Sequence, residues 1–121
     1  MTARPRTKLE KGEDESLTMG VSLESYLLPG ETVASITGHD VVALDDDEEE
    51  AGALDIDNVQ PSGQVELFDG LEVAAGRAIL WSCEGGTAGF TYRLFIAFLT
   101  STGDTKDARI EITVTEANGI A

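Results

Sequence analysis

Cysteine and histidine are nearly absent from this 121-residue sequence, which has one of each, Cys83 and His39. A single cysteine cannot form an internal disulfide, and a single histidine cannot supply a metal site with two histidine ligands. Cys83 ends the apolar run 78–83, where a small buried side chain is expected, whereas His39 lies beside Asp40 in a polar segment. These features exclude a disulfide scaffold and a zinc module, and we expect no Cys83–His39 catalytic pair.

Long hydrophobic runs are also missing. No apolar run approaches the ~20 residues that cross a bilayer as a helix. The basic start, residues 1–8, is followed by the charged segment 9–15 rather than by the apolar region of a secretory signal peptide. We therefore expect no membrane partner and synthesis in the cytoplasm.

Basic residues are scarce, 8 against 23 acidic ones, and the net charge is −15. Half of them, Arg4, Arg6, Lys8 and Lys11, lie in residues 1–11, which carry +3 and leave −18 for the remaining 110 residues. So acidic a body repels phosphate, and we expect it to bind no nucleic acid. Dispersed cations of this kind are typical of a disordered leader or of an arm that docks on an acidic protein surface, and DNA binding by the arm is a weaker alternative.

Strand periodicity dominates the sequence, because turn residues recur at intervals too short for ordinary helices. The clearest alternation is in residues 110–115, where every second residue is apolar. The other predicted strands are 17–21, 31–37, 65–68, 78–83 and 91–100, and residues 22–28 are predicted to form at most one helical turn. About six or seven short strands favour an all-β fold, a small antiparallel β-sandwich.

The segment 91–100 is apolar on both faces. One face holds Tyr92, Leu94, Ile96 and Phe98, and the other holds Arg93, Phe95, Ala97 and Leu99. Only one face of a strand meets the core of a two-layer sandwich, so the second set needs another cover. That cover is either the N-terminal segment or a loop of the same chain, or a partner subunit. Phe95, Ala97 and Leu99 are therefore candidate interface residues, together with the four cations of the arm.

Two further segments resemble functional motifs but lack the required spacing. The six carboxylates of residues 45–50, followed by Asp55 and Asp57, do not match a calcium loop, and no aromatic platform accompanies them for glycosidase chemistry. A solvated loop is the expected structure for such a like-charge block. The glycine-rich segment 84–89 precedes a strand rather than a helix and has no Lys-Ser/Thr, so it is a turn. We expect no catalytic residue, metal or cofactor.

Two blocks of the sequence, in the same order, resemble the fiber-tail adaptor proteins of tailed bacteriophages. Gly85-Gly-Thr-Ala-Gly-Phe-Thr-Tyr-Arg-Leu with 97–109 is similar to the family's GGTAG-x-x-Y turn and Thr-rich turn, and 22–35 is similar to its segment ending in G-E-T-I-A-S. The resemblance implies a non-enzymatic virion protein that joins the tail or connector to fibers or other tail proteins. Its partners would be phage tail, connector and fiber proteins, and it would form a homo-oligomeric ring. An immunoglobulin-like (Ig-like) capsid decoration or accessory protein is the alternative.

The chain is expected to divide into three segments. Residues 1–15 are expected to be a flexible, basic N-terminal arm, residues 16–117 an Ig-like sandwich, and residues 118–121 a C-terminal tail. Residues from about 37 to 62, with the acidic run and His39, are expected to be an insertion relative to the family. In an Ig-like sandwich a tyrosine near the start of the penultimate strand bonds the backbone of the preceding corner, and Tyr92 has that place. Gly85, Gly86 and Gly89 would supply the positive φ angles of the corner.

Overall fold

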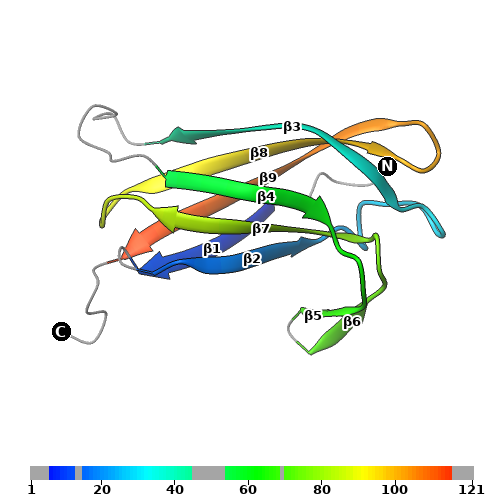
Figure 1. Ribbon diagram of the computed structural model, residues 1–121, viewed down its shortest axis with the longest axis horizontal. Coiled ribbons are helices and arrows are strands. Elements are labelled where there is room, and N and C mark those ends of the chain that lie inside the picture. Colours follow the sequence, from blue (N-terminus) through cyan, green and yellow to red (C-terminus); the bar gives the residue numbers. More distant parts are fainter. Residues whose placement is uncertain (1–5, 13–14, 45–53, 69, 116–121) are drawn as a thin grey trace.

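Two β-sheets packed face to face make up the body of the computed structural model, which describes residues 6–12, 15–44, 54–68 and 70–115 (Figure 1). One sheet has the strand order β1-β9-β8-β3, the other has the order β2-β7-β4, and β5 and β6 form a separate two-stranded hairpin. The strands are β1 (Arg6–Gly12), β2 (Leu17–Ser22), β3 (Val33–Ala43), β4 (Leu54–Pro61), β5 (Glu66–Phe68), β6 (Leu71–Val73), β7 (Ala78–Gly85), β8 (Thr91–Thr100) and β9 (Thr105–Thr115). The described residues form no helix, and the prediction of a small all-β sandwich is confirmed.

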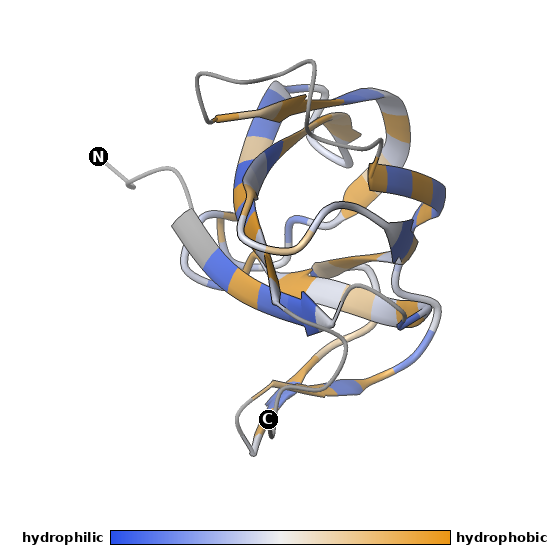
Figure 2. Ribbon diagram, turned by 90° about the vertical axis from the view of Figure 1, so that its left-hand side faces the viewer, coloured by the Kyte–Doolittle hydropathy of each residue, from blue (hydrophilic) through white to orange (hydrophobic). Residues whose placement is uncertain are grey.

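The core lies between the two sheets because apolar side chains alternate along the strands, as the colours of Figure 2 show. In β8 and β9 every second side chain points inward and is fully buried. Trp81 of β7 and Phe98 of β8 are the largest apolar members of this core. The buried core residues of these three strands are Ala78, Ile79, Trp81, Cys83, Tyr92, Leu94, Ile96, Phe98, Ala108, Ile110, Ile112 and Val114.

The N-terminal arm differs from the expectation. We expected residues 1–15 to be a flexible arm, whereas residues 6–12 form β1, which pairs in parallel with residues 109–115 of β9. The pairing satisfies the outer edge of β9, which would otherwise expose a row of unpaired backbone groups. Leu9 packs against the core between the exposed Lys8 and Glu10, an alternation that the high density of charge concealed. Arg4 and the C-terminal residues 118–121 lie outside the described residues.

Residues 37–62, expected to be an insertion, supply framework to both sheets. β3 runs on to Ala43 beside β8, and β4 forms an edge of the second sheet beside β7. The strand signal of β4 is the alternation of the apolar Leu54 and Ile56 with two aspartates. The strand was not predicted, because these aspartates were grouped with the acidic run before them. A bulge follows, where Asn58 has φ +53° and shifts the register. The acidic run 45–50 lies outside the described residues.

The short segments between the long strands are the turn after β2 and the hairpin β5-β6. The segment after β2 makes a single turn, in which the amide of Leu27 donates to the carbonyl of Leu23 at 2.9 Å, as predicted for residues 22–28. The hairpin strand β6 was missed because it is only three residues long. Within the described ranges, no helix has the length and hydrophobicity needed to span a bilayer.

Candidate functional site

The first candidate region is the corner that joins β7 to β8, residues 85–92. Tyr92 is buried, and its hydroxyl accepts a hydrogen bond of 3.0 Å from the backbone amide of Thr87. The corner is also fixed to β9, because the amide of Gly89 donates to the carbonyl of Val114 at 2.8 Å and the amide of Val114 donates to the carbonyl of Phe90 at 3.0 Å. The hydroxyl of Tyr92 thus accepts its hydrogen bond from the backbone of the preceding corner.

Gly85, Gly86 and Gly89 all have positive φ, of +81°, +87° and +89°. Gly86 is the most constrained, because a Cβ there would lie 2.8 Å from Val114 Cγ2 and 3.1 Å from Leu54 Cδ1. At Gly89 a Cβ would meet nothing within 4 Å. The corner therefore needs glycine for its backbone conformation at all three positions and for close packing at Gly86.

Lys11, one of the cations assigned to the arm, belongs to the same corner. Its side chain is buried, and its ammonium donates to the carbonyls of Gly85 at 2.8 Å and Gly12 at 2.6 Å. These bonds attach the end of β1 to the start of the corner. Lys11 is therefore removed from the exposed surface that was expected to contact a partner.

A second polar cluster surrounds Glu31 at the other end of the sandwich. The Glu31 side chain is fully buried, and Thr102 donates to its Oε2 at 2.5 Å. The amide of Leu28 donates to Oε1 at 2.9 Å, and the ammonium of Lys106 lies 3.1 Å from the same oxygen. The bond from Thr102, followed by that from Leu28, lowers the pKa of Glu31 from 4.5 to about 2 although burial opposes this, so the group stays ionised.

Arg77 ties the same segment to the start of β7. Its guanidinium donates to the carbonyl of Glu31 at 2.6 Å and to that of Leu28 at 3.0 Å, and it pairs with the carboxylate of Glu24 at 3.1 Å. Glu31 belongs to the first block of the family resemblance, and Thr102 and Lys106 belong to the second. The two blocks are thus in contact at Glu31. This cluster was not predicted, because its only signal in the sequence is a carboxylate between the turn 29–30 and a strand.

The outer face of β8 holds the three apolar interface candidates. Phe95, Ala97 and Leu99 are half-buried there, and Arg109 stacks over the ring of Phe95 at 5.4 Å from its centroid. Lys8 lies beside Glu111 in the same sheet and is exposed. Residues 6–12 do not cover this face, because they form β1 at the edge of the same sheet, beside β9. A hollow of about 260 Å³ remains, lined by Gly38, His39, Asp40, Phe95, Ala97 and Asp107. No side-chain position is described for Arg6.

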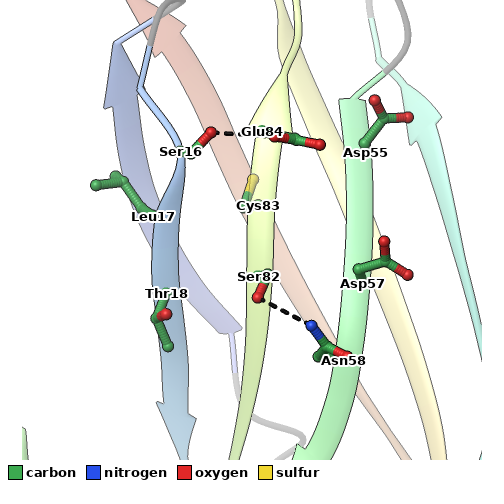
Figure 3. Close-up of a pocket in the computed structure, with 9 residues that line it drawn as sticks. All are labelled: Ser16, Leu17, Thr18, Asp55, Asp57, Asn58, Ser82, Cys83 and Glu84. Carbon is green, nitrogen blue, oxygen red and sulfur yellow. Dashed lines mark hydrogen bonds between the residues drawn. The ribbon is translucent and has the colours of Figure 1, made fainter.

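The outer face of the other sheet has a depression of about 290 Å³ that is lined with acidic and hydroxyl groups (Figure 3). Ser16 donates to Glu84 at 3.1 Å, and Asn58 donates to Ser82 at 3.5 Å. Within the part of the chain that the structure describes, no three His, Cys, Asp or Glu residues are arranged to hold a metal ion. The described residues of the depression therefore supply hydrogen-bonding groups but no set of metal ligands.

Cys83 and His39 lie apart in the fold. Burial raises the pKa of the Cys83 thiol from 9.0 to about 11, so the group remains a thiol at neutral pH. His39 is exposed on β3, in the opposite sheet. Cys83 and His39 are thus on different sheets.

Comparison with known proteins adds one match. The family described as podophage GP4 fiber-tail adaptor protein gp77 matches residues 11–113. The match runs from the end of β1 almost to the end of β9 and includes the corner, the Glu31 cluster and the strands within 37–62. No curated protein matches the chain. Because the match covers most of the sequence, the chain belongs to the podophage GP4 fiber-tail adaptor protein gp77 family.

Proposed function

We propose that this protein is a non-enzymatic component of the virion tail that joins the tail or connector to the fibers. The observation that carries the proposal is the family match over residues 11–113. The chemistry of the side chains supports it. Glu31 is ionised but fully engaged in hydrogen bonds, and Cys83 is a buried thiol, so the charged and nucleophilic groups of the interior serve the fold.

We further propose that the sandwich is of the immunoglobulin type. Its sheets β3-β8-β9 and β2-β7-β4 follow the strand orders C-F-G and B-E-D of Ig domains when β2 is taken as strand B. Tyr92 then lies at the start of strand F, where Ig domains have a tyrosine that bonds the backbone upstream. The hairpin β5-β6 would be an addition between strands D and E.

The outer face of β8 is the surface that we propose for a homo-oligomeric ring on the virion. Phe95, Ala97 and Leu99 supply apolar area there, and the cations of residues 1–8 would meet the acidic body of a neighbour. Repulsion between chains that carry −15 each opposes free association. The purified protein is therefore expected to be mainly monomeric, and the ring is expected to form on the particle.

The ring is tested with Phe95→Asp, and the matched control is Thr18→Asp, an exposed position on the outer face of the other sheet. Both variants are expected to fold, and only Phe95→Asp should fail to enter particles. Normal incorporation of Phe95→Asp would contradict the ring surface and leave the adaptor function in place.

The adaptor function itself is tested with particles assembled without this protein. We expect filled heads that lack fibers, and recovery of fibers when the protein is supplied from a plasmid. A capsid decoration protein, the alternative, would instead give particles with normal fibers and less stable heads. So acidic a body is not expected to bind nucleic acid or anionic membranes in either case.

A further inference from the structure

Between β4 and β7 the chain leaves the sandwich and forms the hairpin β5-β6, which projects from one end of the molecule (Figure 1). Val73 of β6 is buried, and the ring of Phe68 lies 3.1 Å from where a Cβ of Gly20 would be. Gly20 pairs with Leu80, and both lie on the outer side of the sheet β2-β7-β4 because their neighbours in sequence point inward. The hairpin is thus held against the outer side of this sheet.

Backbone hydrogen bonds also fix the two legs of the hairpin. The amide of Ser62 donates to the carbonyl of Ala78 at 2.9 Å, and the amide of Gly76 donates to the carbonyl of Ser62 at 2.8 Å. Ser62 is itself buried. The hairpin therefore leaves the body from a fixed base, and its orientation is set by the fold.

The hairpin carries three exposed apolar side chains, Val65, Leu67 and Leu71, which we call the apolar tip. Leu67 and Leu71 lie on opposite faces of the hairpin, because Leu67 pairs with Glu72 whereas Leu71 pairs with Phe68. The relative exposures of Val65, Leu67 and Leu71 are 55%, 69% and 72%, and these are the three most exposed large hydrophobic residues in the described ranges. The next, Leu28, is 52% exposed and lies elsewhere. Scattered apolar residues are ordinary on a surface, but a group of them on a fixed projection is typical of a contact site.

The charge around the apolar tip selects the kind of partner. Segment 62–76 contains Glu66, Asp69 and Glu72 and no Lys or Arg, and Leu67 pairs directly with Glu72 across the hairpin. A complementary surface is an apolar groove with Lys or Arg at its rim. A second copy of this chain fits poorly, because its net charge is −15 and its Arg77, Arg93 and Lys106 already pair with carboxylates.

We propose that the apolar tip docks into an apolar groove with a basic rim on the fiber protein. This proposal rests on the proposed function, in which the outer face of β8 is used for the ring on the tail. The hairpin lies on the opposite side of the sandwich, beyond the sheet β2-β7-β4, so both surfaces can be occupied at once.

The test uses the double variant Leu67→Asp/Leu71→Asp, with Leu28→Asp as the control at another exposed leucine. Each protein is supplied to particles that lack the wild-type chain, and the amounts of adaptor and fiber per particle are measured by quantitative mass spectrometry. We expect both variants to be incorporated at the wild-type level and the double variant alone to lose fibers at least tenfold. Thermal melts of the purified proteins check folding, and Leu67→Ser and Leu71→Ser replace the double variant if it does not fold.

Two results would overturn this proposal. Normal fibers on particles carrying a folded double variant would remove the apolar tip from fiber binding and leave the adaptor function intact. Loss of the folded double variant itself from the particles would assign the tip to the tail or to the ring. Failure of the proposed function is seen separately, as normal fibers on particles that lack the protein altogether.

Discussion

The two ends of the sandwich are fixed by different means. At the corner end, residues 85–92 are held by glycine conformation, by close packing and by the hydrogen bond that the Thr87 amide donates to the Tyr92 hydroxyl. At the opposite end, the buried carboxylate of Glu31 accepts hydrogen bonds from Thr102 and from the amide of Leu28 and pairs with the ammonium of Lys106. The three features that hold the corner involve no carboxylate, so their contribution to stability should depend little on pH. The Glu31 end should weaken in acid, because its hydrogen bonds favour the ionised carboxylate and protonation of Glu31 would break them.

This difference also concerns function. The hairpin that carries the apolar tip returns to the sandwich near the Glu31 cluster, because Arg77, between β6 and β7, bonds the carbonyl of Glu31 at 2.6 Å. The corner, by contrast, attaches β1 through the buried ammonium of Lys11. The corner end therefore stabilises the fold, whereas the Glu31 end stabilises the fold and also fixes the base of the hairpin.

The largest expected effect is at Gly86. Gly86→Ala should lower the free energy of unfolding by about 3 kcal/mol, since it combines a positive φ with a Cβ placed 2.8 Å from Val114. Gly89→Ala has the same backbone penalty without the collision and should cost about 1 to 2 kcal/mol. Urea denaturation of both variants measures the difference, and equal losses would show that packing at the corner contributes nothing.

The next effect is at Tyr92. Tyr92→Phe should cost about 1 to 3 kcal/mol, because the amide of Thr87 loses the hydroxyl that accepts its hydrogen bond. Tyr26→Phe is the control, since the ring of Tyr26 is in edge contact with Phe98 and remains in the variant. If the two substitutions have the same small effect in a denaturant melt, the hydroxyl of Tyr92 does not anchor the corner.

A smaller effect is the pH dependence of stability, which we expect at the Glu31 end and not at the corner. The pKa of Glu31 is about 2 in the folded protein and 4.5 for an unperturbed glutamate, so its contribution is complete above pH 4.5 and is lost as the pH falls towards 2. At pH 4 the loss attributable to Glu31 should be about 1 kcal/mol relative to pH 7. Urea melts at both pH values compare the wild type with Glu31→Gln, which cannot titrate. The same pH dependence in both proteins would contradict the assignment.

No effect is expected from chelators. The depression lined by Asp55, Asp57 and Glu84 adjoins the corner end, and a bound cation there would make that end depend on metal. We expect the melting temperature to be unchanged by EDTA. A drop that added Ca²⁺ restores would make the depression a cation site and would assign part of the corner's stability to it.

The sequence predicted the parts of the fold whose physical signals are local. Residues 91–100 and 110–115 alternate openly, and the three glycines with Tyr92 identify the corner. The strand 6–12 was missed because a single leucine marks its inner face among charged neighbours, and pairing with β9 is a long-range contact. β4 was missed because Asp55 and Asp57 were grouped with the acidic run 45–50, for which a solvated loop was expected.

The Glu31 cluster shows the limit more clearly. Its members come from residues 28–31 and 102–106, which the sequence separates and the packing of the two sheets brings together. The pattern that favoured a strand after Glu31 contains no sign that its carboxylate would be buried. The exposure of Leu67 and Leu71 was equally hidden, because alternation predicts the face to which each side chain belongs and does not predict whether that face is covered.

The central claim, that this sandwich is a tail adaptor, is tested most directly by locating the protein within the particle. Purified virions are separated into heads and tails, and the copy number of this protein is measured in each fraction together with that of the fiber protein. We predict that the protein stays with the tails at a fixed ratio to the fibers. Recovery with the heads, in proportion to the major capsid protein, would contradict the account.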